Sequence, residues 1–69
     1  MANKMLRELN RLQYLLEDIA EKLNELGGKL YDAKEGELGA ELGDAADVTD
    51  RVARMVAQVR STLLVEGLE

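Results

Sequence analysis

The fold is decided by residues 5–33, which read MLRELNRLQYLLEDIAEKLNELGGKLYDA. Positions i, i+3, i+4 and i+7 lie on one face of an α-helix, so apolar residues at that spacing form a single seam. A 3.5-residue repeat sustained in this way is typical of helices that pair in a coiled coil or a bundle. The seam runs without a break through Met5, Leu9, Leu12, Leu16, Ile19, Leu23, Leu26, Leu30 and Ala33.

The length and composition of the chain restrict how it can be stabilised. It has 69 residues, and Cys, His and Pro are all absent. A domain this short buries a thin core, and small proteins gain stability from disulfides, a metal or oligomerisation. The absence of Cys excludes disulfides and thiolate metal sites, and the absence of His removes the commonest transition-metal ligand. We therefore expect no metal, no cofactor, and stabilisation by oligomerisation or by very regular helix packing.

The chain is predicted to form one helical-hairpin domain over residues 1–69. Helix one is expected over about 3–34 and helix two over about 44–65, from their apolar periodicity. An acidic, Gly-rich connection is expected over about 35–43, because repeated Gly breaks helices and permits turns. The seam of the second helix is expected at Ala45, Val48 or Thr49, Val52, Val56, Val59 and Leu63.

Gly27 and Gly28 are a weak point in helix one, because each Gly costs about 1 kcal/mol against Ala in a helix interior. The helix could end at Leu26 with Gly27 as a left-handed cap. Alternatively it passes through the pair, since Leu30 and Ala33 keep the phase of the seam and a loop has no reason to do so. We favour the continuous helix.

The ends of helix two have recognisable signals. Asp44 is a candidate N-cap, because its carboxylate can accept from the free N–H groups of a first helical turn. Thr49 is an alternative N-cap. Gly67 is expected to close the helix.

Charge is distributed unevenly along the chain. The net charge is −5, and the segment from Asp32 to Asp50 holds seven acidic residues against the single base Lys34. Folding back as a hairpin would give an acidic turn and an opposite end rich in bases, namely Lys4, Arg7, Arg11 and Arg60. Three interpretations remain open: an ordinary solvated surface, self-association with acidic turn against basic end, or a site for phosphates or for a basic protein.

The residues that support catalysis are missing, so we expect the protein not to be an enzyme. Without His or Cys, the chain lacks the usual general base and thiol nucleophile, and Ser61 is its only Ser. Acidic pairs one helical turn apart, as at Glu17 and Glu21, lie off the seam and are expected to face water. The spacing of the aspartates after residue 43 does not match a calcium-binding loop.

These patterns predict an all-α protein, an antiparallel helical hairpin that dimerises into a four-helix bundle. The function expected is a non-enzymatic protein–protein interaction module, such as a small adaptor, chaperone subunit or assembly protein. Its first partner would be itself, as a homodimer, with another protein as a further partner. The alternative is a small regulator that contacts nucleic acid through its basic end, or inhibits a nucleic-acid-binding protein through its acidic turn. Nucleic-acid binding is disfavoured by the acidic composition, because such proteins carry a basic patch.

Two sets of residues are predicted to mediate binding. The first is the oligomer seam, Met5, Leu9, Leu12, Leu16, Ile19, Leu23, Leu26, Leu30, Val52, Val56, Val59 and Leu63. The second is a set of candidate partner contacts, Leu6, Tyr14, Leu15, Arg7, Arg11 and Arg60. No stretch approaches the ~20 apolar residues that span a bilayer, so no membrane association and a cytoplasmic location are expected.

Overall fold

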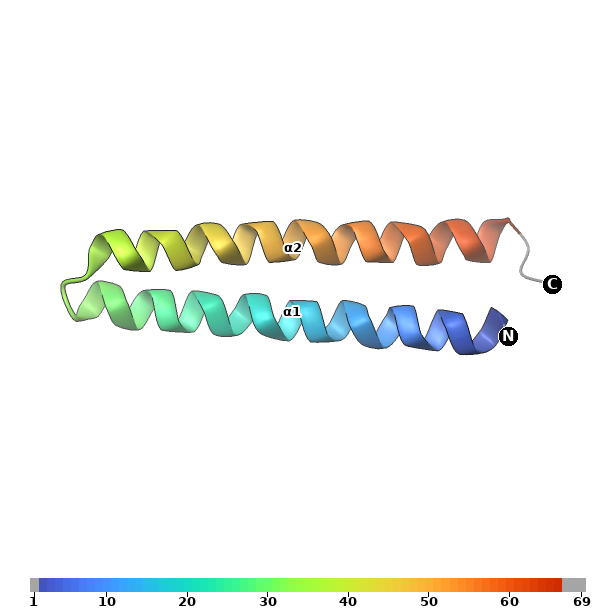
Figure 1. The fold of residues 1–69 in the computed structure, drawn as a ribbon, viewed down its shortest axis with the longest axis horizontal. Helices are drawn as coiled ribbons and strands as arrows, with labels where there is room; N and C mark the ends of the chain where they lie inside the picture. Colours follow the sequence, from blue (N-terminus) through green and yellow to red (C-terminus); the bar gives the residue numbers. More distant parts are fainter. Residues whose placement is uncertain (1, 67–69) are drawn as a thin grey trace.

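The chain forms two long helices that lie side by side and antiparallel (Figure 1). The structure, a computed structural model, describes residues 2–66, with side chains from residue 4 onward. Helix α1 spans Ala2–Asp32 and helix α2 spans Gly36–Val65. Together they make a rod of 54 × 15 × 10 Å. The predicted all-α hairpin is confirmed, while its dimerisation into a four-helix bundle stays a prediction.

Helix α1 continues through Gly27 and Gly28, as predicted. A Cβ atom at Gly27 would lie 2.9 Å from the carbonyl oxygen of Gly39, so the absence of a side chain lets the two backbones approach closely. Gly28 faces open space, with no atom within 4 Å of a Cβ built there. The packing of Gly27 against α2 offsets the conformational freedom that glycine loses in a helix.

The predicted connection over 35–43 is wrong. Only residues 33–35 join the helices, and α2 begins at Gly36, so Gly39 and Gly43 are helical. Neither Asp44 nor Thr49 caps a helix; Thr49 Oγ1 instead donates to the carbonyl of Ala45 at 2.8 Å. The predicted end near residue 65 matches Val65, while Gly67 lies outside the described residues.

Tertiary packing explains why helix forms across these glycines. Gly39, Ala46 and Ala53 follow one another at seven-residue spacing and are the buried residues of α2. This spacing keeps small residues on the side of α2 that meets α1. Most helical stability in proteins comes from such packing, which here outweighs the low intrinsic propensity of Gly.

Backbone hydrogen bonds close the turn between the helices. The N–H of Glu35 donates to the carbonyl of Leu30 at 2.8 Å, and the N–H of Lys34 donates to that of Tyr31 at 3.0 Å. This pair of bonds is the Schellman motif, which needs a left-handed residue after the helix. Lys34 takes that conformation, with φ 66°.

Replacing Lys34 with Gly is therefore expected to stabilise the hairpin. A non-Gly residue in the left-handed region carries a steric penalty of about 1 kcal/mol, which Gly does not have. We expect the thermal midpoint to rise by a few degrees, measured by circular dichroism. Lys34→Ala removes the same charge but keeps the Cβ, so it should not reproduce the gain; an equal rise in both variants would contradict the conformational explanation.

The core between the helices is made of small residues. Ala20, Ala46 and Ala53 are 3%, 0% and 3% exposed, and among residues 4–66 no larger side chain is fully buried. Gly27 and Gly39 complete this row, where the helices meet most closely. A single hairpin thus buries little apolar surface and leaves most of its large side chains in contact with solvent.

Candidate interaction surface

The predicted oligomer seam divides into two sets with different surroundings. Six of its residues are half-buried between the helices: Leu9, Leu16, Leu23, Leu30, Val56 and Leu63. The other six keep 40–51% of their surface exposed: Met5, Leu12, Ile19, Leu26, Val52 and Val59. One seam therefore supplies both the contact within the hairpin and a surface that the hairpin does not cover.

The exposed set belongs to a continuous stripe on each helix. On α1 the stripe is Met5, Leu12, Ile19 and Leu26, seven residues apart. On α2 it is Leu38, Ala45, Val52 and Val59, again seven apart. We call these eight residues the apolar face.

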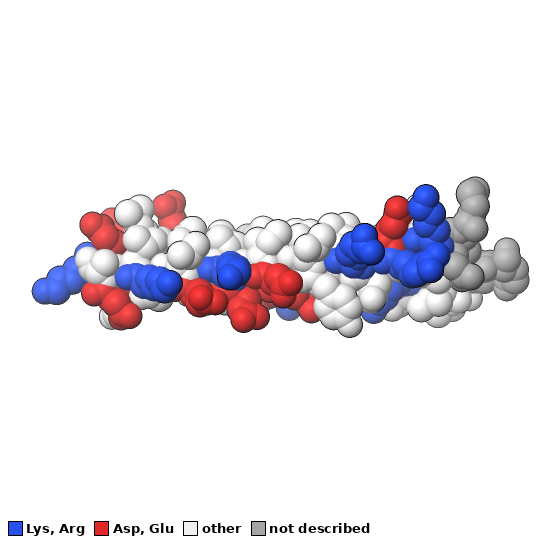
Figure 2. Space-filling view, turned by 90° about the horizontal axis from the view of Figure 1, so that it is seen from below, with Lys and Arg blue, Asp and Glu red and all other residues white. Residues whose placement is uncertain are grey.

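Both stripes lie on the same side of the hairpin. Each stripe residue near the middle of the rod directly precedes a buried one: Ile19 precedes Ala20, for example, and Val52 precedes Ala53. In an antiparallel pair of helices, the residue directly before a contact residue points to the same side of the pair on both helices. Figure 2 shows an uncharged band along the upper margin of the middle of the rod, with acidic side chains gathered below it.

The opposite side of the hairpin is more polar. Its corresponding positions include Asn10, Glu17 and Asn24 on α1 and Asp50 on α2. One broad side of the hairpin therefore has an apolar residue at every stripe position. The other side is polar on α1 and mixed on α2, where Gly43, Ala57 and Leu64 share the heptad position of Asp50.

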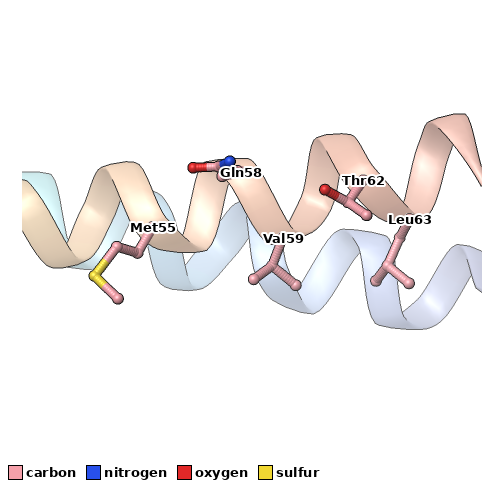
Figure 3. A pocket seen from close by; sticks show the side chains of 5 residues that line it. All are labelled: Met55, Gln58, Val59, Thr62 and Leu63. Carbon is pink, nitrogen blue, oxygen red and sulfur yellow. The ribbon is translucent and has the colours of Figure 1, made fainter.

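A shallow groove lies at the end of the apolar face nearest the chain termini. It is lined by Met55, Gln58, Val59, Thr62 and Leu63 of α2. Figure 3 shows Met55, Val59 and Leu63 projecting from α2 in the same direction. The groove offers an apolar recess rather than a polar site for a small ligand.

Polar side chains beside the contact between the helices make two side-chain hydrogen bonds. Arg60 Nη1 donates a hydrogen bond to Asn10 Oδ1, which links α2 to α1 near the open end. Gln13 Nε2 donates to Glu17 Oε2 at 3.1 Å. The other amide atom, Gln13 Oε1, is buried without a hydrogen-bond partner.

Replacing Gln13 with Leu is expected to stabilise the hairpin. An acceptor buried without a partner destabilises the folded state by about 1 to 3 kcal/mol, and Leu fills a similar volume without that penalty. We expect the thermal midpoint to rise by roughly 5 °C or more. Gln13→Glu, which keeps the shape but buries charge, should lower the midpoint; a fall with Leu would mean that Oε1 is satisfied in solution.

The predicted partner contacts fall into two groups. Tyr14, Leu15, Arg7 and Arg11 are exposed, and together they line one shallow depression on α1. Leu6 is half-buried, and Arg60 is half-buried and bonded to Asn10. These last two residues contribute to contacts within the hairpin, which sequence reasoning did not assign to them.

One member of the apolar face was missed from the sequence. Leu38 lay in the predicted connection, yet it stands seven residues before Ala45 and continues the stripe of α2. That spacing was the available signal, and the neighbouring glycines obscured it.

Other kinds of site find little support within residues 2–66. No group of three or more His, Cys, Asp or Glu residues in this range is placed to hold a metal ion. Neither of the two helices is apolar enough over a sufficient length to cross a membrane.

Fold and surface together define a two-helix antiparallel hairpin with one uncovered apolar side. Comparison of the chain with protein-family models, with curated proteins and with solved structures finds no match. Inferences about function therefore rest on the residues themselves.

Proposed function

We propose that this chain is a non-enzymatic protein–protein interaction module that acts through a self-associating helical hairpin. The observation that carries this proposal is the apolar face, whose large side chains remain about half exposed, while among residues 4–66 the buried positions between the helices are three alanines and two glycines. Burial of apolar surface stabilises by about 25 cal/mol per Å², so covering this face would add several kcal/mol to a marginal fold. A homodimer forming a four-helix bundle is the simplest assembly that covers it.

Sedimentation equilibrium tests self-association directly. We expect the protein to sediment with twice the monomer mass of 7.6 kDa at tens of micromolar concentration. A single species of monomer mass under those conditions would rule out the self-associating module.

A role in binding nucleic acid is the second candidate, because bases cluster at one end of α1. Lys4, Arg7 and Arg11 line one shallow surface together with Glu8, and Tyr14 lies beside it. Basic side chains can neutralise phosphates, and a tyrosine can stack on a base. The net charge of −5 and the lack of further aromatic residues near these bases favour the first candidate.

Electrophoretic mobility shift at low salt separates the two candidates. The protein–protein module is expected to give no shift with RNA or DNA. A shift that disappears when Arg7 and Arg11 are changed to Glu would promote the second candidate. Arg60 is left unchanged in this test, because its bond to Asn10 supports the hairpin itself.

A further inference from the structure

We infer that the apolar face binds the same face of a second copy of this chain, with the two hairpins antiparallel and related by a two-fold axis that passes beside Ile19. The inference rests on the proposed function and adds to it the docking face, the orientation and the register. In this arrangement α1 packs against α1 of the second copy, and α2 packs against α2. The acidic turn of each copy then lies over the basic end of the other.

The dimensions of the apolar face suit a second copy. The broad side of the rod measures 54 by 15 Å, which is an area of about 800 Å². That value matches the surface that each partner buries in a protein–protein interface of standard size. Because the stripes run the length of both helices, an occupant needs to be a rod of the same length, and a second hairpin is one.

The register follows from the spacing of the stripes. In sequence the heptad spacing of the α1 stripe extends to Ala33, in the turn directly after α1, and with that residue it is centred on Ile19, while the α2 stripe is centred midway between Ala45 and Val52. A two-fold axis requires these two centres to lie level with each other along the rod.

Contacts within the hairpin show that the centres are level. Gly27 lies beside Gly39 near the turn, and Asn10 bonds to Arg60 near the open end. Between these two fixed points, Ile19 falls level with Thr49, which lies between Ala45 and Val52. A single two-fold axis can therefore relate α1 to α1 and α2 to α2 of the second copy.

The residues that this axis brings together are complementary. Ile19 meets Ile19 of the second copy, and Leu12 meets Leu26. On α2, Val52 meets Ala45, and Val59 meets Leu38. Val59 lies in the groove beside Met55 and Leu63 (Figure 3), so Leu38 of the second copy has an apolar recess to enter.

Charge selects the antiparallel orientation over the parallel one. The segment from Asp32 to Asp50 holds seven acids and one base, while Lys4, Arg7 and Arg11 line the surface at the opposite end of the rod. Antiparallel copies bring each acidic turn near a basic end, whereas parallel copies would place the two acidic turns together. Opposite charges at the rim of an interface favour the first arrangement, and like charges disfavour the second.

A pair of matched substitutions tests the face. Ile19 is 49% exposed on the apolar face, and Leu64 is 59% exposed on the opposite side, in heptad register with Asp50. We expect Ile19→Asp to weaken dimerisation at least 100-fold in sedimentation, and Leu64→Asp to change it less than 3-fold. If the wild type dimerises and only Leu64→Asp disrupts it, the docking face is wrong while the proposed function stands. A wild type that stays monomeric overturns the proposed function itself.

Single cysteines test the orientation, and the wild type provides no background because it has no Cys. Ile19→Cys is expected to form a disulfide-linked dimer under mild oxidation. Leu12→Cys alone is expected not to, because its two copies would lie about 21 Å apart along the bundle, beyond the reach of a disulfide. A mixture of Leu12→Cys and Leu26→Cys should again give a covalent dimer.

The opposite pattern would overturn the inference. In a parallel dimer, α1 faces α2 of the second copy, so a mixture of Leu12→Cys and Val59→Cys would be linked and the mixture of Leu12→Cys and Leu26→Cys would not. Circular dichroism identifies any variant that fails to fold. Should Ile19→Asp be one of these, the cysteine pattern still decides both face and orientation.

Discussion

Replacing Leu16 with Asp is expected to unfold the protein. Leu16 is half-buried between α1 and α2. The substitution removes apolar burial and places a charge next to the other helix, with a combined loss of about 3 kcal/mol or more. That loss is comparable to the whole stability of a small hairpin, so the helical circular dichroism signal should fall to that of an unfolded chain at 25 °C.

The neighbouring residue supplies a matched control. Leu15 lies one position earlier and is 53% exposed on the outer side of α1. Leu15→Asp introduces the same charge at almost the same point along the helix, but into solvent, and is expected to cost less than about 1 kcal/mol. Equal losses of stability in the two variants would contradict the deeper burial of Leu16 relative to Leu15.

Replacing Gly39 with Ala is expected to have the second-largest effect. A Cβ there would lie 2.6 Å from the carbonyl oxygen of Gly27 and 3.3 Å from the backbone nitrogen of Tyr31. Both are backbone atoms, so the helices themselves would have to move apart. Overpacking of this kind costs about 1 to 3 kcal/mol, more than the helix propensity that Ala adds. The thermal midpoint should fall by roughly 10 °C.

The same substitution at Gly28 should have the opposite sign. A Cβ at Gly28 meets no atom within 4 Å, so Ala adds only its better helix propensity, about 1 kcal/mol. Thermal melts of Gly28→Ala and Gly39→Ala, recorded at equal concentration, give the comparison. Two stabilised variants would mean that the helices do not meet as closely as the glycine contact requires.

The helical parts of the fold could be predicted from the sequence because their apolar residues keep strict phase. The phase of Leu30 and Ala33 was enough to carry α1 through Gly27 and Gly28. The start of α2 could not be predicted in this way, since Gly36, Gly39 and Gly43 have the low helix propensity of a loop. What makes Gly39 helical is its contact with Gly27, and contacts between distant residues are not visible in local propensity.

The sequence predicted which residues form the oligomer seam, but not which of them pack between the helices and which stay exposed. A heptad repeat shows that Leu16 and Ile19 lie on the same broad side of a helix, but it does not show which of them the partner helix covers. That assignment depends on the small residues opposite. The helices approach most closely along the line of small residues Ala20, Gly27, Ala46 and Ala53. Ile19 lies to one side of this line and stays exposed.

The close contact of Gly27 with Gly39 also bears on the order in which the hairpin folds. These residues are separated by only twelve positions, whereas Asn10 and Arg60, at the open end, are separated by fifty. Loop-closure entropy grows with the length of chain enclosed, so the contact beside the turn is the least expensive to form. We therefore expect folding to start at the turn and to proceed toward the open end, because each contact that forms shortens the loop that the next contact must close. Substitutions near the turn should act mainly on the rate of folding, and those near the termini mainly on the rate of unfolding.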